Sequence, residues 1–371
     1  MSVGIFDYLI WRGDVPIEQA PFNEVDGAIL ARLSYLPFEH IVSGRSTEPV
    51  RLAYAAEELI TLPEFEKRVL QKEDAELVRR LSESARFREM QIIDFAAKTD
   101  AETQTQFFAA SVRINDGCVC VCFRGTDNTL IGWREDFNMG YLSETPGQLK
   151  AAAYVEQMLA DGSCPVRIGG HSKGGNLAVY AAVHCSSGLQ DRILAVYSND
   201  GPGFRRDIVE SAAYQRVLPK IHTILPESSI VGMLLEHQEA YEVVRSSNSG
   251  IQQHDAMSWE VLGTSFVYVR EVAAQSLMLD ETMKAWIYQL NGEEREQIVD
   301  TVFGMLEAAD IKTVDDFYHS KWKAVQELMK AKSRLPEKSQ KVFAKALKLL
   351  WSEGNKTVRK TVKQVVGEKR R

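Results

Sequence analysis

A serine set between glycines is the strongest candidate for chemistry in this chain of 371 residues. In "VRIGGHSKGGNLAVYAA", residues 166–182, the pattern G-x-S-x-G runs from Gly170 to Gly174 with Ser172 at its centre. An apolar run precedes it and an Ala-rich run follows it. We therefore expect a strand, a sharp strained turn and a helix that present Ser172 as a nucleophile. Glycines two positions away avoid collisions, and the N-terminus of the helix favours developing negative charge.

Phosphate binding and an ordinary turn are the alternatives for these glycines. A P-loop has its lysine directly after the last glycine, whereas Lys173 precedes Gly174. The dinucleotide fingerprint G-x-G-x-x-G is not matched by glycines at 169, 170, 174 and 175. A plain glycine-rich turn with a surface serine stays open as the non-catalytic interpretation.

A serine nucleophile needs a base and a carboxylate that orients the base. His254 lies in "SGIQQHDAMSW", a loop after the last predicted strand, where the histidine of such a triad belongs; a surface histidine in a polar loop is the alternative. Asp200 follows the predicted strand "RILAVYS" and Glu227 follows "KIHTILP". Both stand at the carboxyl ends of strands, where catalytic groups gather in open α/β sheets. Asp200 is the favoured acid and Glu227 the alternative.

An oxyanion hole needs two backbone N–H groups aimed at the developing negative charge. One follows the serine, at Lys173. The other is expected in a loop after an earlier strand, and "CFRGTDN" places Thr126 there. The alternative for "RGTDN" is a simple tight turn.

The surrounding pattern indicates an α/β protein. "TQFFAASVRI" and "CVCVCFR", separated by "NDG", predict a hairpin at an antiparallel edge. Strands then alternate with helices, which predicts a mostly parallel central sheet with helices on both faces. Cys118, Cys120 and Cys122 alternate as small buried residues would, without a second ligand cluster, so neither a metal nor another cofactor is expected.

Three regions are expected. Residues 1–100 form an N-terminal helical segment packed on the core, in which 24–36 and 52–98 follow a helical pattern. Residues 101–270 form the core, and residues 271–371 form a helical extension with a basic tail. Residues 331–371 hold 13 Lys and Arg against 3 Glu, a charge of +10 that leaves −17 for the rest. An acidic body disfavours nucleic acid as a partner. A basic amphipathic tail either docks on its own domain or contacts a membrane peripherally.

Composition points to a soluble globular protein, with 45% hydrophobic and 26% charged residues. No apolar run is long enough for a transmembrane helix. The first residues lack the cationic region of a signal peptide, and the five cysteines suit a reducing compartment, so a cytoplasmic location is expected.

"FRGT", then Trp133 and Asp136, then "GGHSKGGNLA" resemble the class-3 lipase branch of α/β-hydrolases over roughly residues 105–260. "DYLIWRGD", "PFNEVD" and "SNDGPGF" resemble more closely an uncharacterised bacterial lipase-like family. The resemblance implies an α/β-hydrolase fold, with Thr126 in the oxyanion hole, Ser172 as nucleophile and His254 as base. Class-3 lipases have an aspartate after the strand matching "HTILP", where this chain has "ESSIVG". Either Glu227 or Asp200 substitutes, or the triad is incomplete.

The expected activity is hydrolysis of a carboxylic ester or thioester through an acyl-enzyme, with a lipid-like or small-molecule acyl substrate. The alternative is a catalytically weak or inactive hydrolase fold that serves as a binding or scaffold protein, associated with a membrane through its basic tail.

Overall fold

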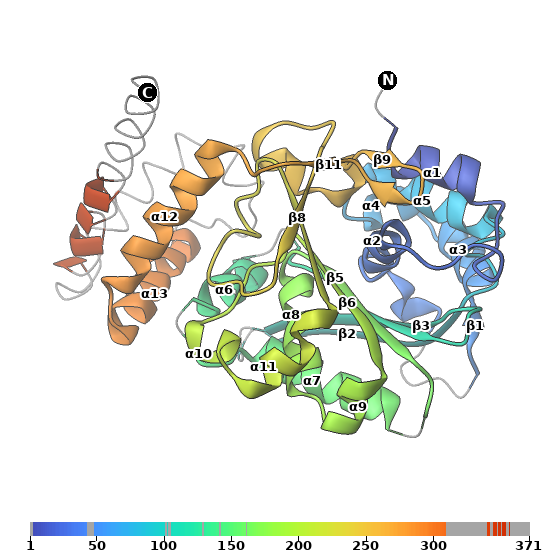
Figure 1. The fold of residues 1–371 in the computed structure, drawn as a ribbon, viewed down its shortest axis with the longest axis horizontal. Helices are drawn as coiled ribbons and strands as arrows, with labels where there is room; N and C mark the ends of the chain where they lie inside the picture. Colours follow the sequence, from blue (N-terminus) through green and yellow to red (C-terminus); the bar gives the residue numbers. More distant parts are fainter. Residues whose placement is uncertain are drawn as a thin grey trace.

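A central sheet with helices on both faces organises the chain (Figure 1). The computed structural model describes residues 3–42, 48–100, 102, 105–127, 130–140, 142–160 and 162–308, and in the tail residues 340, 341, 344–346, 348, 349, 351–353 and 356. Predictions for residues outside these ranges, including most of the basic tail at 331–371, are therefore not addressed by the structure. Of the described helices, none is both long and apolar enough to cross a membrane.

Nine strands of the described chain form one sheet in the order β1-β2-β3-β4-β5-β6-β7-β8-β11. The centre is parallel and positions the site: β4 (Val119–Phe123), β5 (Val166–His171), β6 (Ile193–Asn199), β7 (Ile221–Pro226) and β8 (Tyr241–Val244). The outer strands pair antiparallel: β1 (Val50–Arg51), β2 (Gln91–Asp100), β3 (Thr105–Arg113) and β11 (Tyr268–Val269). The small strands β9 (Val261–Leu262) and β10 (Ser265–Phe266) pair separately.

Alternating residues of β4 face two different apolar clusters. Cys120 and Cys122 pack with the N-terminal helices, and their sulfur atoms lie 3.5 Å apart. Val119 and Val121 face the other cluster, which contains helices α7 (Pro146–Leu159) and α8 (Lys173–His184). Because side chains alternate across a strand, one short apolar run supplies both cores. The prediction of helices on both faces is confirmed.

Helix α2 (Glu24–Leu33) packs on β4, β5 and β6. The sequence pattern predicts this helix, but with one apolar face, whereas Val25 to Leu33 are all buried. The reason is that α2 lies between the sheet and the other N-terminal helices, so both of its sides are covered. These neighbours are α1 (Ile5–Arg12), α3 (Leu52–Thr61), α4 (Phe65–Arg68), α5 (Lys72–Glu83) and the 3₁₀ helix η1 (Phe38–His40).

The helical interpretation of residues 91–98 is wrong, because they belong to β2. β2 pairs with β3 from Gln91–Arg113 to Asp100–Thr105, with a bulge between Ile92 and Asp94. This pairing outweighs the helical propensity of a short apolar run, which is ambiguous in sequence alone. The predicted hairpin of β3 and β4 is present, but β2 and β1 lie beyond it, so it is not the edge of the sheet.

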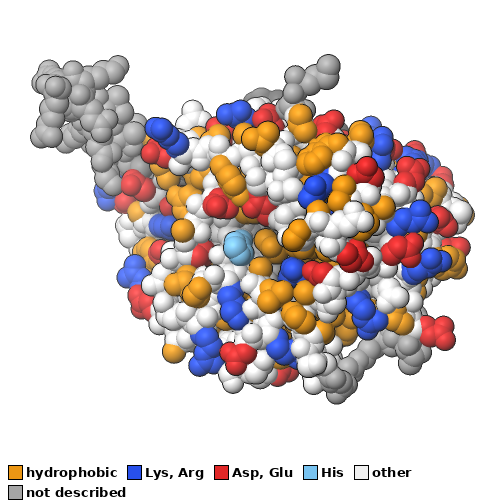
Figure 2. Space-filling view, turned by 45° about the vertical axis from the view of Figure 1, so that its right-hand side comes forward, with side chains coloured by type: hydrophobic (Ala, Val, Ile, Leu, Met, Phe, Trp, Pro, Cys, Tyr) orange, Lys and Arg blue, Asp and Glu red, His pale blue; other side chains and the backbone are white. Residues whose placement is uncertain are grey.

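The C-terminal helices α12 (Ala274–Tyr288) and α13 (Gly292–Ala308) lie on the opposite side of the molecule from α1 to α5 (Figure 1). α13 packs on α6 (Leu130–Asn138), where Phe303 meets Phe137 with ring centroids 5.7 Å apart. The remaining helices are short: α9 (Ser187–Arg192), α10 (Arg206–Val209), α11 (Ala212–Val217), η2 (Leu218–Lys220), η3 (Gly250–His254) and η4 (Ala256–Ser258). On the face in Figure 2, acidic, basic and apolar side chains are interspersed.

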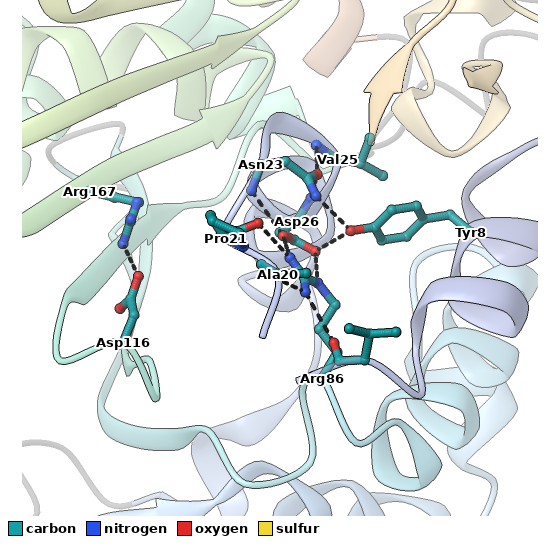
Figure 3. Close-up of polar contacts among 10 residues, drawn as sticks. Tyr8, Ala20, Pro21, Asn23, Val25, Asp26, Arg86, Asp116 and Arg167 are labelled. Carbon is teal, nitrogen blue, oxygen red and sulfur yellow. Dashed lines mark hydrogen bonds and ion pairs between the residues drawn. The ribbon is translucent and has the colours of Figure 1, made fainter. Parts of the chain in front are cut away.

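A buried ion pair ties α2 to the segment after α5 (Figure 3). Arg86 Nε donates to Asp26 Oδ1 at 2.7 Å, and Nη2 donates to Asp26 Oδ2. The other guanidinium hydrogens go to the carbonyl oxygens of Val15, Ala20 and Pro21. Asp26 also accepts from the Tyr8 hydroxyl at 2.8 Å. Both charges are fully buried and fully paired, so removing one side chain would leave the other charge buried without a partner.

We predict that Arg86→Met lowers the free energy of unfolding by about 3–5 kcal/mol, because it leaves the Asp26 carboxylate buried without its cation. Urea denaturation of the full chain measures the change. Arg79→Met is the matched control, since Arg79 pairs with Glu66 at the surface and its loss is expected to cost less than about 1 kcal/mol. Equal effects of the two substitutions would contradict the assignment of a structural role to Arg86.

Candidate active site

Ser172 occupies a strained turn between β5 and α8. Its backbone angles, φ 58° and ψ −131°, lie in a region that residues other than glycine rarely adopt. The Ser172 amide donates to Asn199 O at 2.9 Å, and the Gly175 amide donates to Ser172 O at 2.8 Å. The side chain of Asn199 also donates to Gly170 O at 3.0 Å. Neighbouring backbone thus holds the serine in its strained conformation.

The two glycines of the motif allow backbone segments to approach closely around Ser172. A Cβ atom at Gly170 would lie 2.1 Å from Gly174 O, and one at Gly174 would lie 2.1 Å from Phe123 O. In both cases the obstacle is backbone, which cannot turn aside as a side chain can. The spacing of the glycines is therefore a packing requirement of β4, β5 and α8.

His254 and Asp200 meet beside this turn. Asp200 directly follows β6, and His254 ends η3. His254 Nδ1 lies 2.6 Å from Asp200 Oδ2; the aspartate is fully buried and the histidine is 27% exposed. Since an ionised carboxylate only accepts, Nδ1 carries the hydrogen and Nε2 of the neutral ring carries the lone pair. That tautomer is the one that a general base on Nε2 requires.

The segment "ESSIVG" holds the Asp200 carboxylate in place. Ser229 Oγ donates to Asp200 Oδ1 at 2.5 Å, and the Gly232 amide donates to the same oxygen at 3.1 Å. A Cβ atom at Gly232 would lie 2.3 Å from Asp200 Oδ1, so only glycine permits this approach. The segment in which the lipase resemblance leads us to expect an aspartate thus supplies donors to an aspartate on the neighbouring strand.

Glu227, the alternative acid, lies elsewhere. Its amide donates to Val244 O at 3.1 Å, and its carbonyl oxygen accepts from the Ala273 amide at 2.6 Å. Its carboxylate makes no hydrogen bond to the residues that the structure describes. Of the two candidate acids, Asp200 is the one in contact with His254.

A buried hydrogen-bonded chain runs behind the site from Tyr35 to His254. The Tyr35 hydroxyl lies 2.9 Å from His171 Nδ1, and His171 Nε2 lies 2.6 Å from the backbone oxygen of His254. A carbonyl oxygen only accepts, so His171 carries its hydrogen on Nε2 and accepts from Tyr35 on Nδ1. The Tyr35 oxygen in turn accepts from the Gly125 amide at 2.9 Å. One hydroxyl therefore links the loop of Thr126 to the loop of His254.

His171 is a neutral structural member of this chain. Burial, and then the nearby His254, hold the pKa of His171 well below its usual range. The rings of His171 and His254 pack with centroids 4.7 Å apart. Both nitrogens of His171 are occupied, so the histidine next to the nucleophile supports the second histidine rather than contacting Ser172.

Two backbone N–H groups remain free near the serine. Lys173 begins α8, so its amide has no partner within the helix, and Thr126 follows β4. Neither amide donates a hydrogen bond to another described residue, whereas the flanking amides of Gly125 and Asp127 donate to Tyr35 and Gln106. Free amides in these two positions can accommodate an oxyanion.

The side chain of Lys173 points into the protein interior. Its ammonium donates to Glu135 Oε2 at 2.7 Å and to Gln106 O at 2.8 Å, and both charged side chains are fully buried. Glu135 also accepts from the amides of Gln106 and Gly147, so all these groups are paired. Only the backbone of Lys173 is therefore available to a substrate.

Ser172 and His254 line one cavity of about 480 Å³. Within the described residues, Ser172 Oγ makes no hydrogen bond, and none joins it to His254. Catalytic hydrogen bonds are often long without a substrate and shorten when one binds. The cavity also receives Tyr35 and Gln71 from the N-terminal segment, so that segment forms one wall of the site.

The sequence patterns did not predict three features of the site: Tyr35, the structural role of His171 and the wall that contains Gln71. Tyr35 lies between the apolar positions of a helical pattern, which is a weak signal for a functional residue. Gln71 lies in a stretch that looks like a polar outer helix. No spacing rule connects either residue to Ser172, because their proximity depends on how the N-terminal helices pack on the sheet.

These features define an α/β-hydrolase fold: a parallel central sheet, a serine on the turn between β5 and α8, and an aspartate and a histidine that follow it in chain order. Residues 81–304, more than half of the chain, match the family model described as Mbeg1-like. The chain belongs to the Mbeg1-like family.

Several solved structures are similar to this chain at low identity. The Rhizomucor miehei lipase–propeptide complex is 19% identical, with a TM-score of 0.32 over 43% of this chain and 58% of that chain. Lipase II from Rhizopus niveus is 14% identical, with a TM-score of 0.33 over 51% and 75%. A mutant form of MDLA from Penicillium cyclopium is 11% identical, with a TM-score of 0.36 over 65% and 83%. This chain thus spans less than two thirds of the Rhizomucor chain, and no curated protein matches it.

Asp136 fixes the side chain of Thr126 in the loop after β4. Thr126 Oγ1 donates to Asp136 Oδ2 at 2.6 Å, and Asp136 Oδ1 is buried without a partner among the described residues. Burial raises the pKa of Asp136 to about 6, although Lys173 and the Thr126 hydroxyl oppose the shift. The folded state therefore binds a proton more tightly at Asp136 than the unfolded chain does.

We predict that the stability contributed by protonated Asp136 is complete below about pH 4 and is lost as pH rises through about 6. The shift corresponds to up to about 3 kcal/mol. Asp136→Asn lacks this titration, so its unfolding free energy relative to wild type should improve by up to that amount between pH 4 and pH 8. Urea denaturation across this range measures the difference, with the exposed Asp191→Asn as control. A difference that does not change with pH would contradict the assignment.

Proposed function

We propose that this protein is a serine hydrolase that cleaves a carboxylic ester or thioester. Ser172 is the nucleophile, His254 the general base and acid, and Asp200 the carboxylate that orients the imidazole. The amides of Thr126 and Lys173 bind the oxyanion. The observation that carries the proposal is the 2.6 Å contact between His254 Nδ1 and Asp200 Oδ2 beside a serine held at φ 58°.

The proposed reaction has two halves. Ser172 Oγ attacks the carbonyl carbon while His254 Nε2 takes the hydroxyl proton, and the carbonyl oxygen becomes an oxyanion. Collapse breaks the bond to the leaving group, which departs as an alcohol or thiol with the proton from His254. Water then attacks the acyl-serine, His254 takes the proton of the water, and the carboxylic acid leaves as Ser172 recovers its hydrogen.

The buried partners support these steps. Ser229 and Gly232 donate to one oxygen of Asp200 and leave the other to His254, so the carboxylate is held where it can stabilise the imidazolium formed during each half-reaction. The chain from Tyr35 through His171 limits movement of the His254 backbone. Preorganised groups of this kind lower the barrier because they need no rearrangement during the reaction.

The first experiment is labelling with a fluorophosphonate probe, which reacts with activated serines. We expect covalent modification of wild type and none of Ser172→Ala, because Ser172 is the one described serine that has both free amides and His254 beside it. Mass spectrometry of the digested protein locates the modified residue. Wild type that is folded yet unmodified would reject the proposal and favour a non-catalytic hydrolase fold.

The second experiment separates the two candidate acids. We expect Asp200→Asn to lower kcat on a 4-nitrophenyl ester by about 10⁴-fold, because the amide favours the wrong tautomer of His254. Glu227→Gln is the matched control and should leave kcat unchanged, since its carboxylate does not contact His254. The reverse pattern would assign the acid to Glu227.

A further inference from the structure

The cavity beside Ser172 is polar where a lipid-binding site is apolar. Residues with amide side chains line it from two separate segments, Gln71 before α5 and Asn248 and Gln252 before His254. Its aliphatic members, Leu70 and Ile251, are 41% and 54% exposed, which places them at the rim. Ligand pockets for apolar molecules are lined mainly by hydrophobic side chains with a few polar groups. Among the described lining residues of this cavity, polar residues outnumber hydrophobic ones.

We infer that the substrate is a small, uncharged ester or thioester whose body bears hydroxyl or amide groups, and that Gln71 selects it by accepting a hydrogen bond. The inference rests on the proposed function, because it assigns a substrate class to the same site. The volume of about 480 Å³ lies within the range of small-molecule pockets.

Gln71 has an unused acceptor. Its backbone amide donates to Asp74 Oδ2 at 3.0 Å, which fixes the residue at the start of α5. Its side-chain oxygen Oε1 is buried, yet it has no hydrogen-bond partner among the described residues. A buried polar atom without a partner costs free energy. Because Gln71 lines the cavity, a rotation of its side chain that brings Oε1 to a hydroxyl or N–H group of a ligand there would relieve that cost.

The charges at the cavity argue against an anionic substrate. Arg32 is the cation of the described lining, and it already donates to both oxygens of Asp74 at 2.6 and 2.8 Å. Asp255 is the carboxylate among the described lining residues of the cavity, and Asp74 lies behind Arg32. Because Arg32 is already paired with Asp74 and Asp255 lies at the same cavity, an incoming anion would meet no unpaired guanidinium or ammonium group among the described lining residues. A neutral polar body fits these surroundings better.

The test compares esters that differ only in hydroxyl groups. Butyl acetate is paired with glycerol monoacetate, and methyl butyrate with methyl 3-hydroxybutyrate; acid release by the full chain is followed by titration at constant pH. We expect kcat/KM to be at least about tenfold higher for the hydroxylated member of one pair, since a site with a buried acceptor discriminates against a substrate that leaves it unpaired.

Gln71→Met keeps the length of the side chain and removes its acceptor, so we expect it to reduce that preference by about tenfold. Lys72→Met, on the exposed neighbouring position, should leave the preference unchanged. A second measurement needs no variant: across 4-nitrophenyl esters from acetate to palmitate, wild type should be most active on the short acyl chains.

Fluorophosphonate labelling of the same preparation distinguishes a wrong substrate assignment from a wrong assignment of hydrolase function. If Ser172 is labelled but activity peaks on long acyl chains, or if Gln71→Met keeps the full preference, the assignment of a polar substrate is overturned while the hydrolase function stands. If folded wild type is not labelled, the proposed function fails, and the substrate assignment fails with it.

Discussion

The arrangement of the candidate site depends on one buried hydroxyl group, that of Tyr35. Its oxygen accepts from the Gly125 amide and its hydrogen goes to His171, which holds the backbone of His254. The loop with the free amide of Thr126 and the loop with His254 are thus fixed relative to one atom. That atom belongs to the N-terminal segment, so this segment is a part of the site rather than a cover over it.

Buried ion pairs hold the helices of this segment together. Arg86 pairs with Asp26 in α2, and Arg32 at the end of α2 pairs with Asp74 in α5. Each pair costs desolvation free energy on folding, which close contacts and additional hydrogen bonds offset. An apolar contact of similar area would let the packed helices slide past each other. The Arg86 guanidinium, in contrast, uses all of its N–H groups in hydrogen bonds and therefore has one position. These pairs fix the position of α2 within the segment, and the turn that follows α2 brings Tyr35 to His171.

The carboxylate beside His254 follows a different strand from the one that the resemblance to class-3 lipases implies. In the resemblance to class-3 lipases, the acid follows the strand that corresponds to β7, but here that segment contributes Ser229 and Gly232 as donors. Asp200 at the end of the adjacent parallel strand β6 occupies the position beside His254. Neighbouring carboxyl ends of parallel strands lie at one edge, so an acid on either strand can reach the same histidine.

The sequence by itself determined what depends on local backbone geometry. Gly170 and Gly174 surround Ser172 because neighbouring backbone leaves no room for a Cβ atom, and the alternation in "CVCVCF" follows from the period of a strand. Tertiary structure alone decided that residues 91–100 form a strand, that Asp200 rather than Glu227 meets His254, and that Tyr35 and Gln71 line the cavity. These outcomes depend on contacts between segments far apart in the chain, and no local pattern encodes which of several suitable residues will meet.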